Sequence, residues 1–303
     1  MATSKLVIVE SPAKAKTIAK FLGRGFKVEA SQGHVRDLPK SQIGVDVDAG
    51  FEPKYITIRG RGDILNRIRK EARSASKVYL ATDPDREGEA ISWHLANVLG
   101  IDENSPCRIE FNEVTQKAVK NAVKNPRAID LHRVDAQQAR RVLDRLVGYK
   151  ISPILWAKVK KGLSAGRVQS VAAKMICDRE NEIEIFVPEE YYIISAQFRI
   201  NGSAIPTRFF GLREEKLEVH SREECDRLLE QCRQGAYKVC QIKRAERRKF
   251  PAAPFTTSNL QQEASRKLGF TTQKTMQIAQ QLYEGVDIQG EGSQGLVTYI
   301  RTD

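Results

Sequence analysis

The stretch ATDPDREGE, residues 81–89, follows a short apolar run that is typical of a buried strand. The residues after it, 90–99, have the pattern of a helix that ends at a glycine. The stretch is therefore predicted to be a strand-to-helix turn carrying Asp83, Asp85 and Glu87. Carboxylate oxygens that converge on such a turn suit Mg²⁺. Acids are also favoured at a helix N-terminus by the helix dipole, so this pattern alone leaves both explanations open.

Two further strand–helix units predict the fold class. Residues 5–9 predict a buried strand and residues 13–22 a helix, while residues 108–111 and 114–123 predict a third pair. Strands that alternate with helices predict a parallel sheet with helices on its faces. Ligands of such sheets bind beyond the carboxyl ends of the strands, so Glu10 and the acidic turn are expected to share one site.

The organisation changes beyond these units. Residues 36–63 have little periodicity and are expected to form an excursion away from the sheet. The later segments have helical or strand-like patterns. Helices are expected over residues 131–146, 165–185, 222–232, 258–268 and 272–283, and strands over residues 191–196, 204–210 and 296–300. A proline-rich linker at residues 251–254 precedes the last two helices.

Composition limits the classes of function. The chain has 303 residues and a formal charge of +12, which favours a polyanionic partner such as nucleic acid. Its five cysteines include no C-x-x-C pair, which argues against a disulfide framework or a zinc ribbon. No apolar run approaches the roughly 18 residues that span a membrane, and no signal segment is present, so a cytoplasmic protein is expected. Neither a P-loop nor a G-x-G-x-x-G turn occurs, so no nucleotide cofactor is expected.

Some basic and acidic side chains have spacings that suit phosphate chemistry. Glu10 is placed for proton transfer and Lys14 for binding a phosphate, although both would also suit a solvated helix start. Arg140 and Asp144 are four residues apart on a predicted helix, where they form either a surface ion pair or an arginine oriented onto phosphate. Residues 166–169 place Gly, Arg and Gln at a helix N-terminus, which suits phosphate contact.

Tyr299 and Arg301 are two residues apart, so on a strand they would share one face. A tyrosine beside an arginine is a candidate nucleophile toward phosphorus. A tyrosine in a strand-like run is also explained by packing alone.

Taken together and in order, these motifs resemble those of the bacterial type IA DNA topoisomerases, in the topoisomerase I branch. The matching stretches are residues 7–18, 33–39, 83–89, 111–113, 139–149, 163–170, 254–269 and 295–303. The resemblance implies an α/β fold with further helical and β-rich parts. The implied domains are a Rossmann-like Toprim domain over residues 1–128, a helical DNA-binding domain over 129–186, a β arch over 187–250, and an incomplete nucleophile domain over 251–303. The excursion 36–63 of the Toprim domain would pack on the helical domain.

The resemblance also implies a role for each candidate residue. Tyr299 would attack a phosphodiester of single-stranded DNA and form a 5′-phosphotyrosine link, which conserves the bond energy and explains the absence of an ATP site. Arg301 would steady the scissile phosphate, Glu10 would assist proton transfer, and Lys14 would contact the phosphate. The metal site would hold Mg²⁺, needed chiefly for rejoining, on Glu10, Asp83, Asp85 and Glu87. The DNA strand would be positioned by His34, Arg140, Arg141, Asp144, Arg167 and Gln169.

The expected function is therefore ATP-independent relaxation of negatively supercoiled DNA by strand cleavage, strand passage and religation. The partner would be a single-stranded region of the underwound duplex, and the protein would be a monomer in the nucleoid, without a membrane or nucleotide cofactor. Because the family's chains continue beyond the tyrosine, this chain looks like a truncated fragment, expected to bind DNA yet relax it poorly or not at all. A Toprim-type metal-dependent nuclease or primase, and a non-catalytic DNA-binding protein, are the alternatives.

Overall fold

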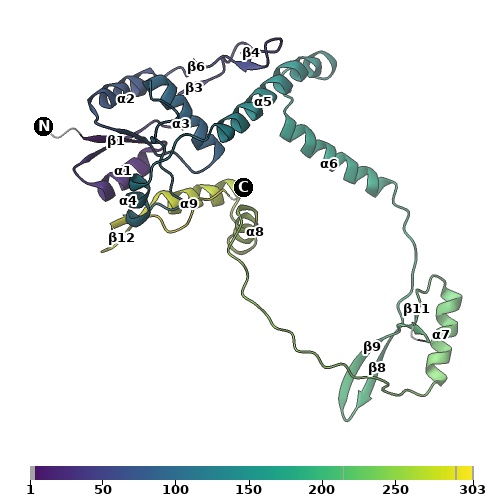
Figure 1. Cartoon of the computed structure of the whole chain (residues 1–303). Helices are drawn as coiled ribbons and strands as arrows, with labels where there is room; N and C mark the ends of the chain where they lie inside the picture. The colour runs from purple at the N-terminus through teal and green to yellow at the C-terminus, as the bar shows by residue number, and fades with distance from the viewer. Residues whose placement is uncertain (1–3, 214, 291, 302–303) are drawn as a thin grey trace. The chain divides into compact units, whose positions relative to one another are not determined.

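The computed structural model describes residues 4–213, 215–290 and 292–301. The chain divides into two compact units, one formed by the residues up to 169 together with those from 253 onward, and the other by residues 170–252 (Figure 1). Among the described residues, no helix has the length and apolar character needed to cross a membrane.

A parallel sheet forms the centre of the first unit. Strand β1 (Lys5–Val9) lies between β2 (Phe26–Ala30) and β7 (Val78–Leu80), and both neighbours run parallel to it. The strand expected over residues 108–111 is reduced to a single parallel bridge between Leu80 and Arg108. On its other side Arg108 forms a single antiparallel bridge with Arg127. Strand β2 was not predicted, although its sequence FKVEA alternates apolar and charged residues over five positions.

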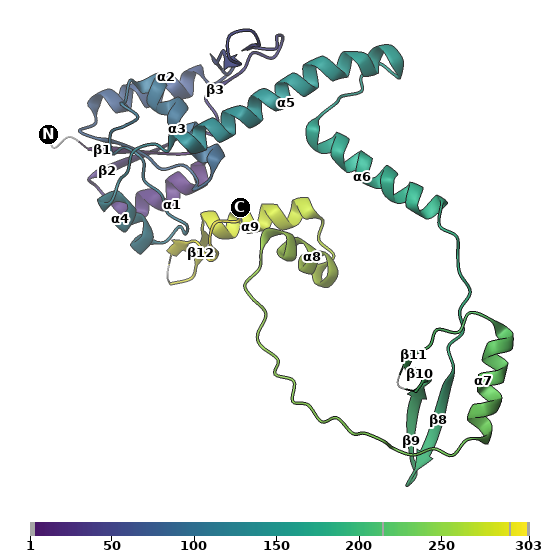
Figure 2. The same cartoon turned by 45° about the vertical axis from the view of Figure 1, so that its right-hand side comes forward.

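Helices cover both faces of the sheet, and the alternation of β1 decides which residues they meet (Figure 2). Leu6 and Ile8 pack against α2 (Gly62–Ser74) and α3 (Arg86–Leu99). Val7 and Val9 point to the other face, where α1 (Pro12–Leu22) and α4 (Gln116–Lys124) cover them. The expected layered α/β architecture is thus confirmed, although α2 was not among the predicted helices.

The excursion contains four short strands in two antiparallel pairs. Strand β3 (Arg36–Asp37) pairs with β6 (Ile56–Thr57), and β4 (Val45–Asp46) pairs with β5 (Glu52–Pro53). Leu38 and Val45 of this segment pack against Val142 of the long helix α5 (Leu131–Lys158). The excursion therefore lies beside the helix that carries three of the six predicted DNA-binding residues.

The C-terminal segment returns to the first unit as two helices and a hairpin. Its elements are α8 (Thr257–Leu268), α9 (Thr272–Glu284), β12 (Val286–Ile288) and β13 (Gly292–Gln294). Tyr283 of α9 is fully buried in the core formed with β1, α1 and α4. The strand expected over residues 296–300 is wrong: the backbone there is irregular, because Leu296 N bonds to Leu282 O while Tyr299 N bonds to Asn112 O on a different segment.

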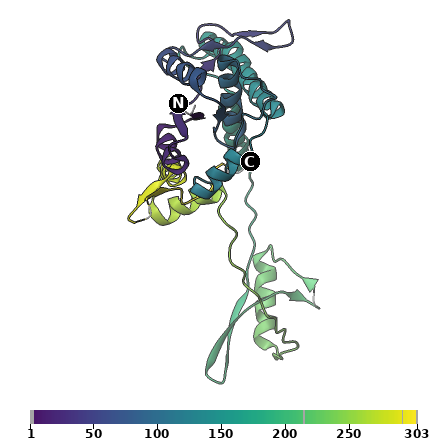
Figure 3. The same ribbon diagram turned by 60° about the vertical axis from the view of Figure 1, so that its left-hand side comes forward.

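The second unit contains a β-rich part with a helix of its own, shown in green in Figure 3. Strands β8 (Ser195–Ile200) and β9 (Ser203–Arg208) form a hairpin, β10 (Gly211–Leu212) pairs with β11 (Glu215–Lys216), and α7 (Arg222–Gln234) follows. Ile194, Val219, Cys225 and Leu228 form its small core. The strand expected over residues 191–196 begins only at Ser195, because Tyr192 pairs with Val219 in an isolated bridge. Helix α6 (Arg167–Glu184) begins in the first unit and enters the second.

Candidate active site

The acidic residues lie where the sequence places them, beyond the carboxyl ends of neighbouring parallel strands. Glu10 follows β1 directly, and Asp83 and Asp85 follow β7. Asp85 is the N-cap of α3, since its carboxylate accepts a hydrogen bond of 2.7 Å from Gly88 N. A Cβ at Gly88 would lie 2.1 Å from Asp83 O, so only glycine allows the turn to close this tightly. The acidic turn is therefore a rigid, locally determined structure.

Lys14 joins the first two carboxylates. Its ammonium lies 2.7 Å from Glu10 Oε1 and also donates to Asp83 Oδ1, and its side chain is 1% exposed. Burial, together with a hydrogen bond to Asp83, raises the pKa of Glu10 to about 8. Despite burial, the hydrogen bonds from Glu10 and Lys14 lower the pKa of Asp83. Near neutral pH the cluster therefore holds a protonated Glu10 and an ionised Asp83.

Tyr283 completes this cluster from the C-terminal segment. Its hydroxyl donates to Asp83 Oδ1 over 3.1 Å, and its ring faces the Lys14 ammonium at 4.7 Å. The same ring meets the Tyr299 ring edge-on, with centroids 5.3 Å apart. Tyr283 therefore connects the acidic cluster to the candidate nucleophile, a role that the sequence analysis missed.

Tyr299 and Arg301 both reach Asp85. The Tyr299 hydroxyl donates to Asp85 Oδ2 over 2.8 Å, and Arg301 Nη1 lies 2.5 Å from the same oxygen. Burial and the charges of Asp83 and Asp85 raise the pKa of the Tyr299 phenol, so the hydroxyl is protonated in this arrangement. The two side chains thus lie side by side although the segment that carries them is not a strand.

A buried arginine binds the backbone of the acidic turn. Arg108 has no exposed side-chain area and donates to the carbonyl oxygens of Leu80, Thr82 and Asp83, at 3.2, 2.8 and 2.7 Å. Its charge is balanced by the equally buried Glu89, 3.0 Å away. The only available sequence signal was a charged residue at the start of an apolar run, which is too common to be informative.

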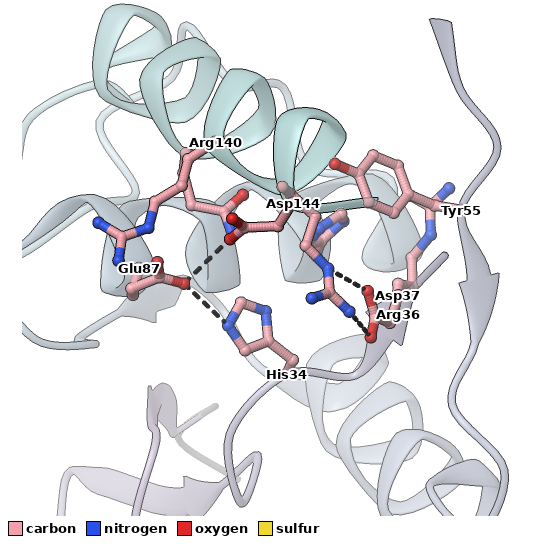
Figure 4. A pocket seen from close by; sticks show the side chains of 10 residues that line it. His34, Arg36, Asp37, Tyr55, Glu87, Arg140 and Asp144 are labelled. Atoms are coloured by element: carbon pink, nitrogen blue, oxygen red, sulfur yellow. Dashed lines mark hydrogen bonds and ion pairs between the residues drawn. The ribbon is translucent and has the colours of Figure 1, made fainter. Parts of the chain in front are cut away.

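Glu87 faces the excursion and α5 instead of the other acids. It lies 3.4 Å from His34 Nε2 and accepts a hydrogen bond of 3.1 Å from Gln137. These two hydrogen bonds hold the pKa of Glu87 at about 2. Figure 4 shows His34, Glu87, Arg140 and Asp144 around one polar cavity of about 230 Å³.

Three polar atoms in the wall of this cavity have no hydrogen-bond partner among the described residues. They are Tyr55 Oη, His94 Nδ1 and Gln137 Oε1. Burial lowers the pKa of His94 to about 3, so its imidazole is neutral and has one donor and one acceptor nitrogen. Such unsatisfied groups are typical of a cavity that takes a polar ligand or ordered water.

The predicted DNA-binding residues differ in how they are engaged. Arg141 makes a bidentate pair with Asp37, at 2.9 and 2.5 Å, and Arg167 pairs with Asp144 at 2.5 Å. Arg140 lines the polar cavity, whereas Gln169 turns back onto the Ser164 carbonyl of its own loop. The structure therefore places three of the six, Arg140, Arg141 and Asp144, on α5 and leaves Gln169 locally bound.

A second cavity adjoins the first along α5. It has a volume of about 750 Å³, and its walls combine basic and aromatic side chains, including Arg145, Tyr149 and Trp156. Arg145 donates to the Tyr149 hydroxyl over 2.7 Å. The sequence analysis missed these residues, although Arg145 and Tyr149 are four apart on the same helix as Arg141.

The four predicted metal ligands are not assembled into one group. Across residues 4–213, 215–290 and 292–301, no three His, Cys, Asp or Glu side chains are arranged to hold a metal ion. Lys14, Arg301 and His34 engage these carboxylates instead. The donor chemistry still fits a hard divalent cation, because all four candidates offer carboxylate oxygens on adjacent segments.

Comparison with known proteins places this geometry in a family. Residues 5–114 match the model of the Toprim domain, and residues 128–303 match that of the DNA topoisomerase family. The chain therefore belongs to the bacterial type IA DNA topoisomerases, as the motifs predicted. Toprim domains generally bind divalent metal ions.

A solved structure supports the same assignment. The chain is similar to full-length topoisomerase I from Thermotoga maritima, with 45% sequence identity and a TM-score of 0.82. The match covers 98% of this chain and 49% of that one, so this chain spans about half the length of the solved relative.

Proposed function

We propose that this chain carries the cleavage and rejoining centre of an enzyme that relaxes negatively supercoiled DNA without ATP. The observation that carries the proposal is the placement of Tyr299, whose hydroxyl lies 2.8 Å from Asp85 with Arg301 on the same carboxylate oxygen. A tyrosine hydroxyl beside a proton acceptor and a guanidinium has what attack on a phosphodiester requires.

The chemistry balances with the groups present. A bond forms from Tyr299 Oη to phosphorus, the bond from phosphorus to the 3′-oxygen breaks, and Asp85 accepts the phenol proton. The departing 3′-oxygen needs a proton, which Glu10 can supply because its pKa of about 8 keeps it protonated near neutral pH. Rejoining is the reverse, and the energy of the phosphodiester is retained in the phosphotyrosine, so no nucleotide is consumed.

Two cations of the protein have separate tasks. Arg301 neutralises charge on the phosphate as the Tyr299 bond forms. Lys14 contacts both Glu10 and Asp83 from its buried position, and its charge lowers the pKa of each carboxyl. Asp83, Asp85 and Glu87, with Glu10 beside them, are the residues that would hold Mg²⁺, which supplies positive charge near the phosphate, chiefly for rejoining.

We also propose that the substrate at this site is a single strand. Cavities along α5 offer His34, Arg140 and Arg141 for phosphates, and the neighbouring Tyr149 and Trp156 offer rings on which bases stack. Asp144 orients Arg167, and Gln169 would turn from Ser164 to meet the strand. Sequence-independent phosphate contact combined with stacking is the usual recognition of unpaired DNA.

The domain division belongs to the same proposal. Residues 1–128 form the Toprim domain, residues 129–186 the helical DNA-binding domain, residues 187–250 the arch segment and residues 251–303 part of the nucleophile domain. The monomer is the proposed working form, because Tyr299 reaches the acids of its own chain.

The test uses a single-stranded oligonucleotide labelled at its 3′ end. After a detergent quench, a tyrosine linked to the 5′-phosphate keeps the label on the protein, giving a slow band on a denaturing gel. The band should vanish in Tyr299→Phe and persist in the control Tyr191→Phe, an exposed tyrosine of the second unit. A nuclease or primase would keep its activity in Tyr299→Phe, and a non-catalytic protein would bind the DNA without any band.

A further inference from the structure

Helix α2 presents a basic groove that the proposed cleavage site does not use. The groove has a volume of about 610 Å³ and is lined by Asn66, Arg69, Lys70, Arg73 and Ser74, all from this helix. It lies on the side of α2 away from the core, since Leu65 and Ile68 are the buried residues of the helix. The groove is therefore a surface feature of the first unit, separate from the acidic cluster.

The basic residues of α2 fall into two sets. On one side Arg67 pairs with Glu29 at 3.0 Å, and Glu71 of the same helix receives Lys27 at 2.7 Å. Within the described residues, Arg69, Lys70 and Arg73 have no such ion pair. Three cations that line one groove without an acidic neighbour indicate a surface for an anion with several charges.

The N-terminal end of α2 contacts the segment that leads to His34 of the candidate site. Arg61, at the N-terminal end of α2, donates to Gln32 over 3.1 Å, and Gln32 is two residues before His34. From Arg61 to Arg73 the helix rises about 18 Å, at 1.5 Å per residue. Arg69 and Arg73 are about 6 Å apart along the axis of α2. Two successive phosphate intervals of one DNA strand have a similar length along the duplex axis, at about 3.4 Å each.

The lining residues favour double-stranded over single-stranded DNA. Sites for unpaired DNA combine cations with aromatic rings on which bases stack, as Tyr149 and Trp156 would on α5. None of the five residues lining the α2 groove is aromatic. Cations with small polar side chains are the composition that contacts a phosphate backbone without reading bases.

We infer that the groove formed by Asn66, Arg69, Lys70, Arg73 and Ser74 binds the phosphate backbone of duplex DNA outside the cleavage site. The inference rests on DNA being the substrate class proposed above. The duplex that flanks the cleaved single strand would then contact the side of α2 that faces away from the core.

The test is the salt dependence of binding, measured by fluorescence anisotropy on a blunt duplex and on a single strand of equal length. Each phosphate contact contributes a slope of about −0.9 in log K against log salt for a duplex, so R69Q/K70Q/R73Q should lower the magnitude of the duplex slope by about 2.7. The matched control K117Q/K120Q/K124Q removes three exposed lysines from α4, on the other face of the sheet, and should leave that slope nearly unchanged.

Three results would overturn the inference: an unchanged duplex slope in R69Q/K70Q/R73Q, an equal change in both triple variants, or a change confined to the single strand. An unchanged duplex slope would mean that the groove binds an acidic protein instead of DNA. An equal change in both triple variants would mean that only the net charge of the protein affects binding. The covalent band of the tyrosine assay separates this inference from the proposed function, because it should persist in R69Q/K70Q/R73Q. A changed duplex slope without any covalent band would support the groove and contradict the proposed chemistry.

Discussion

Removing the buried carboxylate of Glu89 should cost the first unit a large share of its stability. Arg108 and Glu89 have no exposed side-chain area, and their Nε and Oε2 atoms are 3.0 Å apart. Arg127 adds hydrogen bonds of 2.7 and 2.9 Å to the same carboxylate. Glu89→Gln leaves the buried guanidinium of Arg108 without its counter-charge, and breaking a buried pair in this way costs about 3–5 kcal/mol.

The ionisation of Glu89 gives a second estimate of the same size. Burial alone would raise its pKa, yet the hydrogen bonds from Arg127 and the charge of Arg108 hold the pKa at about 2, against an ordinary value of 4.5. That difference corresponds to about 3 kcal/mol of stability. Because the pKa is lower in the folded protein, the contribution is complete above pH 4.5 and is lost as the pH falls towards 2.

The assay is urea unfolding followed by the fluorescence of Trp93, which lies on α3, in a Trp156→Phe background. Glu89→Gln should move the midpoint to lower urea with an unchanged slope, and the gap from the parent should shrink below pH 4.5. Glu52→Gln, an exposed carboxylate without an ion pair among the described residues, should change stability by no more than about 0.5 kcal/mol. A loss below about 1 kcal/mol in Glu89→Gln, or a gap that does not depend on pH, would show that the Arg108–Glu89 pair does not supply this stability.

Three further predictions concern the acidic cluster. Covalent band formation should decline as the pH rises through about 8, where Glu10 loses its proton, and Glu10→Gln should give a low and flat profile; a decline that persists in Glu10→Gln would contradict the assignment. Tyr283→Phe should destabilise the unit by about 1–3 kcal/mol in urea unfolding, because Asp83 loses a buried donor, and should weaken the band; wild-type values for both would exclude this role. Gly88→Ala should lower the thermal midpoint of unfolding, because its Cβ would lie 2.1 Å from Asp83 O. The control Gly148→Ala in α5, whose Cβ would lie 3.8 Å from its nearest neighbour, should leave the midpoint unchanged or raise it. Equal midpoints in the two variants would show that the acidic turn can relax.

Features that depend on local spacing could be predicted from the sequence. The acidic turn is one, because Asp85 caps the helix that follows it and Gly88 bonds back to it within three residues. The alternation of β1 between two helical layers is another, since a strand buried on both faces is apolar throughout. In both cases the residues that decide the structure are neighbours in the chain.

Features that depend on contacts between distant segments could not be predicted in this way. Tyr283 reaches Asp83 across 200 residues, and nothing in its helical context distinguishes it from a core tyrosine. Residues 296–300 read as a strand because they are apolar and β-branched, but their backbone partners lie on separate segments and no ladder forms. The acids were expected to hold a metal ion, and the cations that engage two of them, the buried Lys14 and the half-exposed Arg301, come from α1 and the C-terminal segment.

The two cations of the site differ in how readily they can meet a phosphate. Lys14 is 1% exposed and lies between two carboxylates, so withdrawing it would leave buried charges without a partner, at a cost of about 3–5 kcal/mol. Arg301 is 53% exposed, although its partner Asp85 is only 4% exposed. In the proposed chemistry an incoming phosphate would therefore meet Arg301 and not Lys14, and Arg301 turning to the phosphate would leave Asp85 to accept the proton of Tyr299. Lys14 would stay with Asp83, whose pKa its charge lowers.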